Sequence, residues 1–286
     1  MDFSEIAGAP AMSARLALLA ALGICTGAAA QAGCADLPDA CKIGTGAYHI
    51  ALPEGATKAP VVMFLHGAGG NGRNVMRNTA LVTSFTARGY AVIAPSAGTI
   101  VGSRFKGLWN FYPGREGRDD TAFLGAVVQD SAARFDLDTD NVLLTGFSAG
   151  AFMVTYLACA TPEMFSAYAP IAGGFWRPHP DACAGPVALF QTHGWTDKTV
   201  PLEGRPLGGG RFIQGDIFAG MEIWRIANAC PNMAPDAFTT TGRFMRRSWT
   251  DCAQGSALEF ALFPGGHSIP RGWGDMTLDW YEALPD

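Results

Sequence analysis

The sequence predicts an α/β fold with a mainly parallel, doubly wound sheet and helices on both of its faces. Short apolar runs, such as residues 61–65 and 141–145, alternate along the chain with amphipathic segments of helical spacing. This alternation is typical of parallel strands that are joined by helical crossovers. Of the 286 residues, 49% are hydrophobic and 16% are charged, which provides a core for one large domain and excludes wholesale disorder.

Each expected strand is a short apolar run, and each expected helix follows one of these runs with an apolar face at helical spacing. Asp119 or Asp120 is placed to cap the second of these helices. Ligands of such sheets bind beyond the carboxyl ends of the strands, so we expect the functional side chains in the loops at those ends. The expected strands are residues 61–65, 91–94, 141–145, 167–171, 187–192 and 258–263, and the expected helices are residues 74–88, 121–135, 149–160 and 276–283.

Residues 203–251 interrupt the alternation with a segment rich in glycine and aromatic residues that also contains Cys230 and Cys252. The segment is too short to carry a core of its own. We therefore expect a lid-like insertion, stapled by a disulfide, within a single catalytic domain over residues 33–286.

The N-terminal region has the pattern of a signal peptide over residues 1–32. Arg15 precedes an apolar run at 16–25, and residues 30–32 fit the small-x-small cleavage rule. The run is too short to span a membrane. Asp2 and Glu5 do not suit a signal, which makes Met12 the expected true start. The sequence thus predicts secretion, either to the extracellular space or to the periplasm, with no membrane span.

Cleavage of this segment removes Cys25 and leaves six cysteines. An even number in an exported protein indicates disulfides, although six cysteines allow fifteen connectivities. No C-x-x-C pattern occurs, so we expect no metal site. The simplest scheme joins neighbours, as Cys34–Cys41, Cys159–Cys183 and Cys230–Cys252.

The formal net charge is −5, and no long run of like charges occurs. A surface for nucleic acid or for anionic membranes is therefore not expected.

The first catalytic candidate is Ser148, in the chain's only G-x-S-x-G pattern, Gly146-Phe147-Ser148-Ala149-Gly150. The pattern follows an expected strand and opens an expected helix, which is where a nucleophilic serine stands on a sharp turn. The alternative interpretation is a glycine and serine turn without chemistry.

A serine hydroxyl needs a base, and the chain has five histidines. His267 follows the last expected strand, where the base falls in the chain order serine, acid, histidine. His66 and His193 each end a strand in a His-Gly pair and are expected to fix turns. We expect His49 and His179 on the surface.

The acid candidate is Asp197, because it follows the expected strand at 187–192 and can hold the imidazole N–H. Its rivals Asp216 and Asp251 both lie in the insertion. After the first strand, residues 66–71 are rich in glycine, which lets the N–H of Ala68 face the nucleophile beside the N–H of Ala149 as an oxyanion hole. A phosphate cradle is the alternative for this loop, but no Walker lysine or G-x-G-x-x-G helix pattern follows, and no cofactor is expected.

Over residues 44–286 the chain resembles the secreted polyhydroxybutyrate depolymerase and feruloyl esterase family of α/β-hydrolases. The resemblance implies an α/β-hydrolase fold, a Ser148–Asp197–His267 triad, an oxyanion hole with Ala68 and Ala149, and ester substrates. Residues 111–114 depart from it, because they lack the paired cysteines of many relatives. The motifs that carry it are residues 65–71, Trp109-Asn110, Asp119-Asp120, residues 146–150, 193–201, 224–230 and 265–268.

The predicted function is that of a secreted serine carboxylesterase that acts, as a monomer, on polyhydroxyalkanoate (3-hydroxybutyrate) oligomers, polymer or similar polyesters. The first alternative is a feruloyl or acetyl xylan esterase of plant cell walls. Peptidases of this fold usually carry a large gating domain, for which 286 residues leave no room. An alternative of another class is a catalytically dead hydrolase scaffold that only binds. Trp109, Trp176 and Trp195 are candidates for substrate binding, although each could equally pack in the core.

Overall fold

The computed structural model describes residue 34, residues 39–103 and residues 106–285, all of which belong to one compact unit. The expected signal peptide, residues 1–32, and the expected start at Met12 lie outside the described residues.

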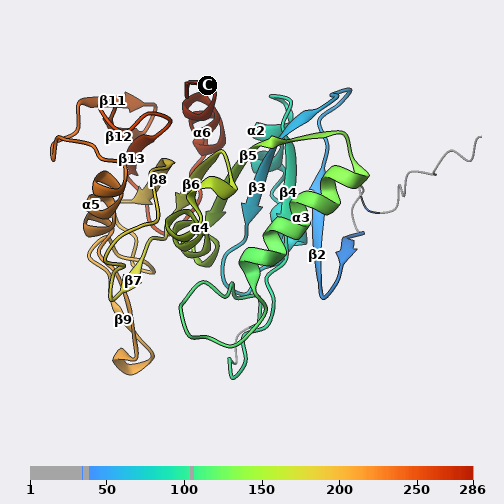
Figure 1. Ribbon diagram of the computed structural model, residues 1–286, viewed down its shortest axis with the longest axis horizontal. Helices are drawn as coiled ribbons and strands as arrows, with labels where there is room; N and C mark the ends of the chain where they lie inside the picture. Colours follow the sequence, from blue (N-terminus) through green and yellow to red (C-terminus); the bar gives the residue numbers. More distant parts are fainter. Residues whose placement is uncertain (1–33, 35–38, 104–105, 286) are drawn as a thin grey trace, which may run out of the picture. The chain divides into compact units, whose positions relative to one another are not determined.

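A ten-stranded sheet forms the centre of this unit, with the strand order β1-β2-β4-β3-β5-β6-β8-β13-β12-β11 (Figure 1). The six strands from β4 to β13 in this order are parallel, and antiparallel strands extend the sheet at both edges. The mainly parallel sheet predicted from the sequence is therefore confirmed. Its strands are β1 (Cys41–Ile43), β2 (Gly46–Ala51), β3 (Ala59–Leu65), β4 (Ala91–Pro95), β5 (Leu137–Phe147), β6 (Ala167–Ile171), β8 (Ala188–Gly194), β11 (Ala237–Thr241), β12 (Phe244–Trp249) and β13 (Ala257–Phe263).

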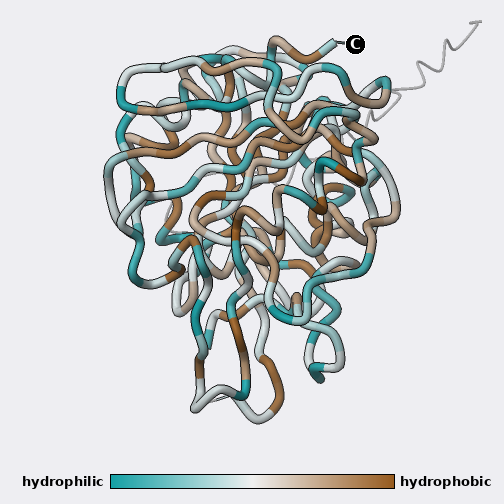
Figure 2. Tube along the Cα trace, turned by 90° about the vertical axis from the view of Figure 1, so that its left-hand side faces the viewer, coloured by the Kyte–Doolittle hydropathy of each residue, from teal (hydrophilic) through white to brown (hydrophobic). Residues whose placement is uncertain are grey.

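Helices cover both faces of the sheet, which is why the central strands are apolar on both sides. Along β3, Met63 and Leu65 pack into the core on one face, while Val62 and Phe64 pack into the core on the other. In the hydropathy view, the hydrophobic segments accordingly gather in the middle of the unit (Figure 2). One face carries α3 (Asp120–Arg134), α4 (Ala149–Ala160) and α5 (Ile217–Ala227), and the other carries α1 (Gly72–Arg77), α2 (Thr79–Thr86) and α6 (Trp273–Glu282).

The single helix expected over residues 74–88 is in fact two helices, α1 and α2. They separate at Asn78, whose backbone angles of φ −80° and ψ 72° are not helical. The side chain of Asn78 accepts a hydrogen bond from the N–H of Leu81 and so caps the second helix. The apolar periodicity runs through the break, so it could not reveal the cap.

The expected lid, residues 203–251, divides into three structures, of which the middle one is α5. Its first part forms β9 (Pro206–Leu207), the short 3₁₀ helix η2 (Gly208–Gly210) and β10 (Phe212–Gln214), which pairs with β9 and with β7 (Trp176–Arg177) in a separate small sheet. Its last part forms β11 and β12, which extend the main sheet beside β13. The first part stands apart from the main sheet, below the carboxyl ends of its strands, whereas α5 packs against a face of that sheet (Figure 1).

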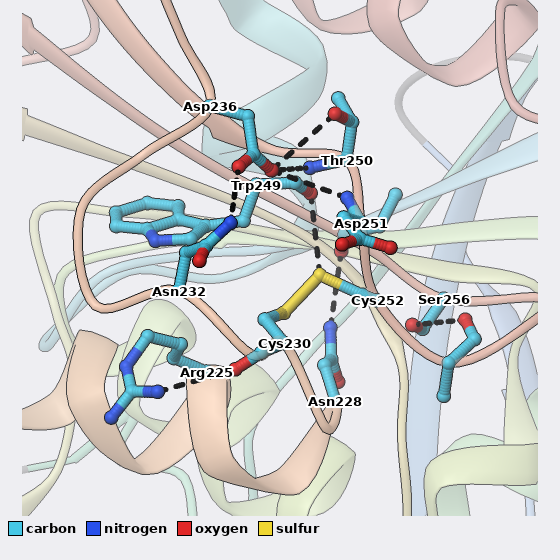
Figure 3. Close-up of a disulfide and its surroundings, with 12 residues drawn as sticks. Arg225, Asn228, Cys230, Asn232, Asp236, Trp249, Thr250, Asp251, Cys252 and Ser256 are labelled. Atoms are coloured by element: carbon cyan, nitrogen blue, oxygen red, sulfur yellow. Dashed lines mark hydrogen bonds between the residues drawn. A yellow bond between two sulfur atoms is a disulfide. The ribbon is translucent and has the colours of Figure 1, made fainter.

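The six described cysteines form the three neighbour disulfides, Cys34–Cys41, Cys159–Cys183 and Cys230–Cys252. The third bond joins the segment after α5 to the turn after β12 (Figure 3). The backbone N–H groups of Thr250 and Asp251 in that turn donate hydrogen bonds to the carboxylate of Asp236, which directly precedes β11. The disulfide therefore ties the turn after β12 to the end of α5, and the carboxylate ties the same turn to the start of β11.

Gly150 allows α4 to pack closely on β3, and this contact fixes where the helix begins. A Cβ atom at Gly150 would lie 2.2 Å from the carbonyl oxygen of Leu65 and 2.9 Å from that of His66. Both neighbours are backbone atoms, which cannot turn aside as a flexible side chain can. Any other residue would therefore push α4 away from β3.

We expect Gly150→Ala to destabilise the protein by about 1–3 kcal/mol, the usual cost of forcing a methyl group into a packed core. Gly220→Ala in α5 is the matched control, because its Cβ would meet only Phe175, at an ordinary 3.6 Å. There the gain in helix propensity should keep or raise stability. Urea unfolding of both variants measures the difference. Equal stability of the two variants would contradict the close packing of α4.

Candidate active site

Three polar side chains meet at the carboxyl ends of three parallel strands. Ser148 follows β5, Asp197 lies in the loop after β8, and His267 follows β13. Parallel strands bring their carboxyl ends to one edge, so residues separated by 70 and 119 positions in the chain become neighbours there.

Ser148 occupies the sharp turn between β5 and α4. Its φ of 57° lies in the left-handed region that disfavours side chains, and its N–H donates to the carbonyl of Ile171 at 3.0 Å. A Cβ at Gly67 would lie 3.4 Å from the Ser148 Cβ, and one at Gly173 would lie 2.9 Å from the Ser148 carbonyl oxygen. Two further loops thus close tightly around the serine and hold its strained backbone in place.

His267 joins the serine to the carboxylate. Its Nε2 lies 2.9 Å from the Ser148 Oγ, and its Nδ1 lies 2.7 Å from the Asp197 Oδ2. The ring of Phe147 packs against the imidazole, with 4.7 Å between the ring centroids. Because the carboxylate accepts from Nδ1–H, it leaves Nε2 free to accept the serine proton.

Asp197 is buried and ionised. Its Oδ1 accepts hydrogen bonds from the backbone N–H groups of Thr199 at 2.8 Å and Val200 at 2.9 Å. Burial alone raises the pKa of Asp197, but the hydrogen bonds from His267 and from these two N–H groups outweigh it, and the pKa falls below its ordinary value.

The two rival candidates for the acid, Asp216 and Asp251, make contacts away from His267. Asp216 caps α5, because its carboxylate accepts from the N–H of Ala219. Asp251 is exposed in the turn beside the third disulfide. Within the described part of the chain, neither is hydrogen-bonded to His267.

His193 is a neighbour of this group that the sequence reasoning assigned only to a turn. It is fully buried, donates from Nε2 to the carbonyl of Val200 at 2.8 Å, and lies 3.6 Å from the Asp197 Oδ2. Burial lowers its pKa, which keeps the ring neutral. The only feature of the sequence that could have indicated this contact is the spacing of four residues between His193 and Asp197. The expected surface position of His49 is wrong, because that residue is also buried.

The loop at residues 66–71 is held by backbone hydrogen bonds and by His66. The His66 Nδ1–H donates to the carbonyl of Gly67 at 2.8 Å, and its Nε2 accepts from the N–H of Ala97 at 3.0 Å. Burial lowers the pKa of His66, which agrees with a neutral ring in both roles. Among the described residues, the N–H groups of Ala68 and Ala149 have no protein acceptor, so both are available to an oxygen near Ser148.

The three candidate tryptophans differ in exposure. Trp109 is completely buried and its indole N–H donates to the carbonyl of His66 at 2.9 Å, so the prediction that it contacts substrate is wrong. It supports the 66–71 loop instead. Trp176 is 8% exposed within an aromatic cluster, whereas Trp195 is 57% exposed and lines a hollow of about 400 Å³ with Met245 and other residues of β12 and β13. Sequence could not separate the three, because burial is a tertiary property.

The arrangement of Ser148, His267 and Asp197 can activate a hydroxyl for attack on a carbonyl carbon. The imidazole can take the serine proton, the carboxylate can stabilise the resulting imidazolium, and the two N–H groups can bind a developing oxyanion. The described residues contain no cluster of histidine, cysteine and acidic side chains suited to a metal ion. They also contain no helix that is long and apolar enough to cross a membrane.

Comparison with known proteins agrees with this geometry. The family model "Esterase PHB depolymerase" matches residues 46–182. The probable feruloyl esterase C of Aspergillus terreus is 26% identical over 282 residues, which cover 93% of this chain and 94% of that protein. The poly(3-hydroxyalkanoate) depolymerase C of Paucimonas lemoignei is 25% identical over 66% of this chain and 46% of that protein.

Among solved structures, the acetyl xylan esterase from Aspergillus awamori superposes with a TM-score of 0.60 and 17% identity, over 83% of this chain and 94% of that one. This likeness concerns the fold, which is that of the α/β-hydrolases, as the sequence predicted. The family model and the relatives say more than the fold: they support the family of polyhydroxybutyrate depolymerases and feruloyl esterases, and the chain is a carboxylesterase of that type.

Proposed function

We propose that this carboxylesterase works by acyl transfer through Ser148, with His267 as the base and Asp197 as the residue that orients it. Ser148 attacks the ester carbonyl and His267 takes its proton, then returns a proton to the departing alcohol. The N–H groups of Ala68 and Ala149 hold the oxyanion. Water, activated by the same histidine, then releases the acid. The continuous hydrogen bonds from Ser148 to His267 to Asp197 carry the proposal, and they count against a binding protein without activity.

For the substrate, we propose short 3-hydroxybutyrate oligomers or similar polyesters. One relative is named a poly(3-hydroxyalkanoate) depolymerase, and an apolar cluster that includes Phe152 and Val200 lies beside the serine and the Asp197 loop. Feruloyl esters of plant cell walls are the second candidate, favoured by the feruloyl esterase that matches 93% of the chain. The aromatic side chains of the cluster suit either an aliphatic acid or a phenolic ring.

We further propose that the protein is secreted, as a monomer with one catalytic domain over residues 33–286. Three disulfides support export, because reducing compartments rarely preserve them. Within the 203–251 insertion, the part that can act as a lid is the one containing β9 and β10, because it stands apart from the main sheet.

Asp197→Asn should lower kcat for p-nitrophenyl butyrate by about 10,000-fold, because an amide cannot stabilise the imidazolium and favours the wrong tautomer. Ser148→Ala should lower kcat to the small residual rate that substrate binding and the oxyanion hole provide without a nucleophile. The matched control is Asp216→Asn, since asparagine caps a helix as well as aspartate does and Asp216 touches no triad residue. Steady-state hydrolysis of the ester checks all three variants. Full activity in Ser148→Ala, or an equal loss in Asp216→Asn, would contradict the assignment.

A panel of purified esters separates the substrate classes. We expect kcat/KM for the 3-hydroxybutyrate trimer to exceed that for methyl ferulate and for acetylated xylan, because the oligomer places a flexible aliphatic acid beside the serine. Release of acid, followed by chromatography, measures each rate with the same enzyme stock. A higher value for methyl ferulate would favour the feruloyl candidate and leave the triad assignment intact.

A further inference from the structure

A half-buried arginine lies inside a box of aromatic rings near the serine. We call Phe111, Tyr112, Trp176 and Phe212 the aromatic cage. The Arg115 Cζ lies 4.6 Å from the ring centroid of Phe212, 5.3 Å from Trp176, 5.4 Å from Tyr112 and 5.9 Å from Phe111. The rings come from three separate segments, namely the loop before α3, β7 and β10. These segments follow β4, β6 and β8 of the main sheet, so each begins at the carboxyl-end edge where Ser148 also lies.

The cage adjoins the catalytic group directly. Phe152 follows Ser148 by four residues in α4, which is about one helical turn, or ~6 Å along the axis. Its ring packs 5.4 Å from Phe111 and 5.7 Å from Trp176. On the other side, Val200 packs in the same cluster, and its N–H donates to Asp197. A short flexible molecule bound at Ser148 therefore has the cage within its reach.

The charge inside the cage has no counterion among the residues that the structure describes. No carboxylate of the described chain lies within ion-pair distance of Arg115. Burial lowers the pKa of Arg115, and so does the neighbouring Arg211, whose guanidinium lies over the same Phe212 ring at 5.4 Å. In addition, the Trp176 side chain is more than nine-tenths buried, with 8% of it exposed. Its Nε1–H has no acceptor among the described residues. Two guanidinium groups and one indole N–H thus lie at this cage without an acceptor side chain among the described residues.

Desolvating a cation without a partner costs free energy, and so does burying an N–H without an acceptor. A bound anion would offset both costs at once. The planar fork of a guanidinium matches a carboxylate, which can accept two parallel hydrogen bonds from it. The aromatic walls also shield Arg115 from part of the solvent, which strengthens the attraction between opposite charges.

We propose that Arg115, with Arg211 and the Trp176 indole, binds a free carboxylate carried by the ester substrate. This inference rests on the proposed esterase function and names a feature of its substrate. Two sources share this chemistry, namely the acid end of a hydroxyalkanoate oligomer and a uronate on a cell-wall sugar. In either case the enzyme favours an ester that lies a fixed distance from a negative charge.

Substrates that differ only in that charge test the proposal. Acids of the 3-hydroxybutyrate dimer, trimer and tetramer are compared with their methyl esters. We expect the wild type to prefer at least one acid over its methyl ester by roughly tenfold or more in kcat/KM, corresponding to one charge-assisted hydrogen bond. Arg115→Gln should abolish that preference through KM and leave the methyl ester rates unchanged, which also shows that the variant is folded.

The matched control is Arg243→Gln, because Arg243 is exposed at the far edge of the sheet, in the turn between β11 and β12. It should keep the preference for the acid. An acid preference that survives in Arg115→Gln, or one that is lost equally in Arg243→Gln, would overturn the proposal. Hydrolysis of the methyl esters without any acid preference in the wild type would also overturn it, while leaving the proposed esterase function standing.

A binding measurement separates the inference from catalysis and identifies the source of the carboxylate. Calorimetry with the Ser148→Ala protein uses the 3-hydroxybutyrate anion, the glucuronate anion and methyl 3-hydroxybutyrate as the neutral control. Binding of one anion that is lost in the Ser148→Ala, Arg115→Gln double variant supports the site and names its source, even if no ester is hydrolysed. Failure of both anions to bind at millimolar concentration would contradict the site.

Discussion

The close approach of α4 to the end of β3 sets the geometry of the whole site. Gly150 lets the helix begin where its backbone nearly touches the carbonyl of Leu65, and this contact forces the chain through a tight turn at Ser148. The turn holds Ser148 in a strained, left-handed backbone conformation. Its hydroxyl then stands at the edge of the sheet, within hydrogen-bond distance of His267.

The polar groups around this turn are arranged in layers of decreasing exposure. His267 is partly exposed and contacts Ser148, while Asp197 behind it is buried and held by two backbone N–H groups. Behind Asp197 lies His193, which is neutral and fully buried. The 66–71 loop is supported in the same way, because the neutral ring of His66 and the indole of Trp109 are both buried and hydrogen-bond to its backbone. Rigid support of this kind keeps catalytic groups in position before the substrate binds.

Sequence reasoning reaches furthest where chemistry is encoded locally. The turn motif around Ser148 and the position of His267 after the last strand depend on chain order, which the sequence displays directly. It also favoured Asp197 over Asp216, because only the former follows a strand of the parallel sheet. The parallel strands themselves were visible as apolar runs, since both of their faces are buried.

Sequence reasoning failed where contacts between distant segments decide the outcome. Trp109 looks like any aromatic residue in a loop, and only packing against the His66 loop makes it a buried support. The break at Asn78 depends on one side-chain hydrogen bond that apolar periodicity does not register. The cage around Arg115 needs rings from segments about a hundred residues apart, so no local sequence pattern predicts it.

The most direct test of the account is a crystal structure of the wild-type protein after reaction with diethyl 4-nitrophenyl phosphate, which traps nucleophilic serines as a mimic of the tetrahedral intermediate. We predict a phosphorus bonded to the Ser148 Oγ, with the phosphoryl oxygen at about 2.7–3.1 Å from the N–H groups of Ala68 and Ala149. An adduct on another residue, or a phosphoryl oxygen turned away from both N–H groups, would contradict it.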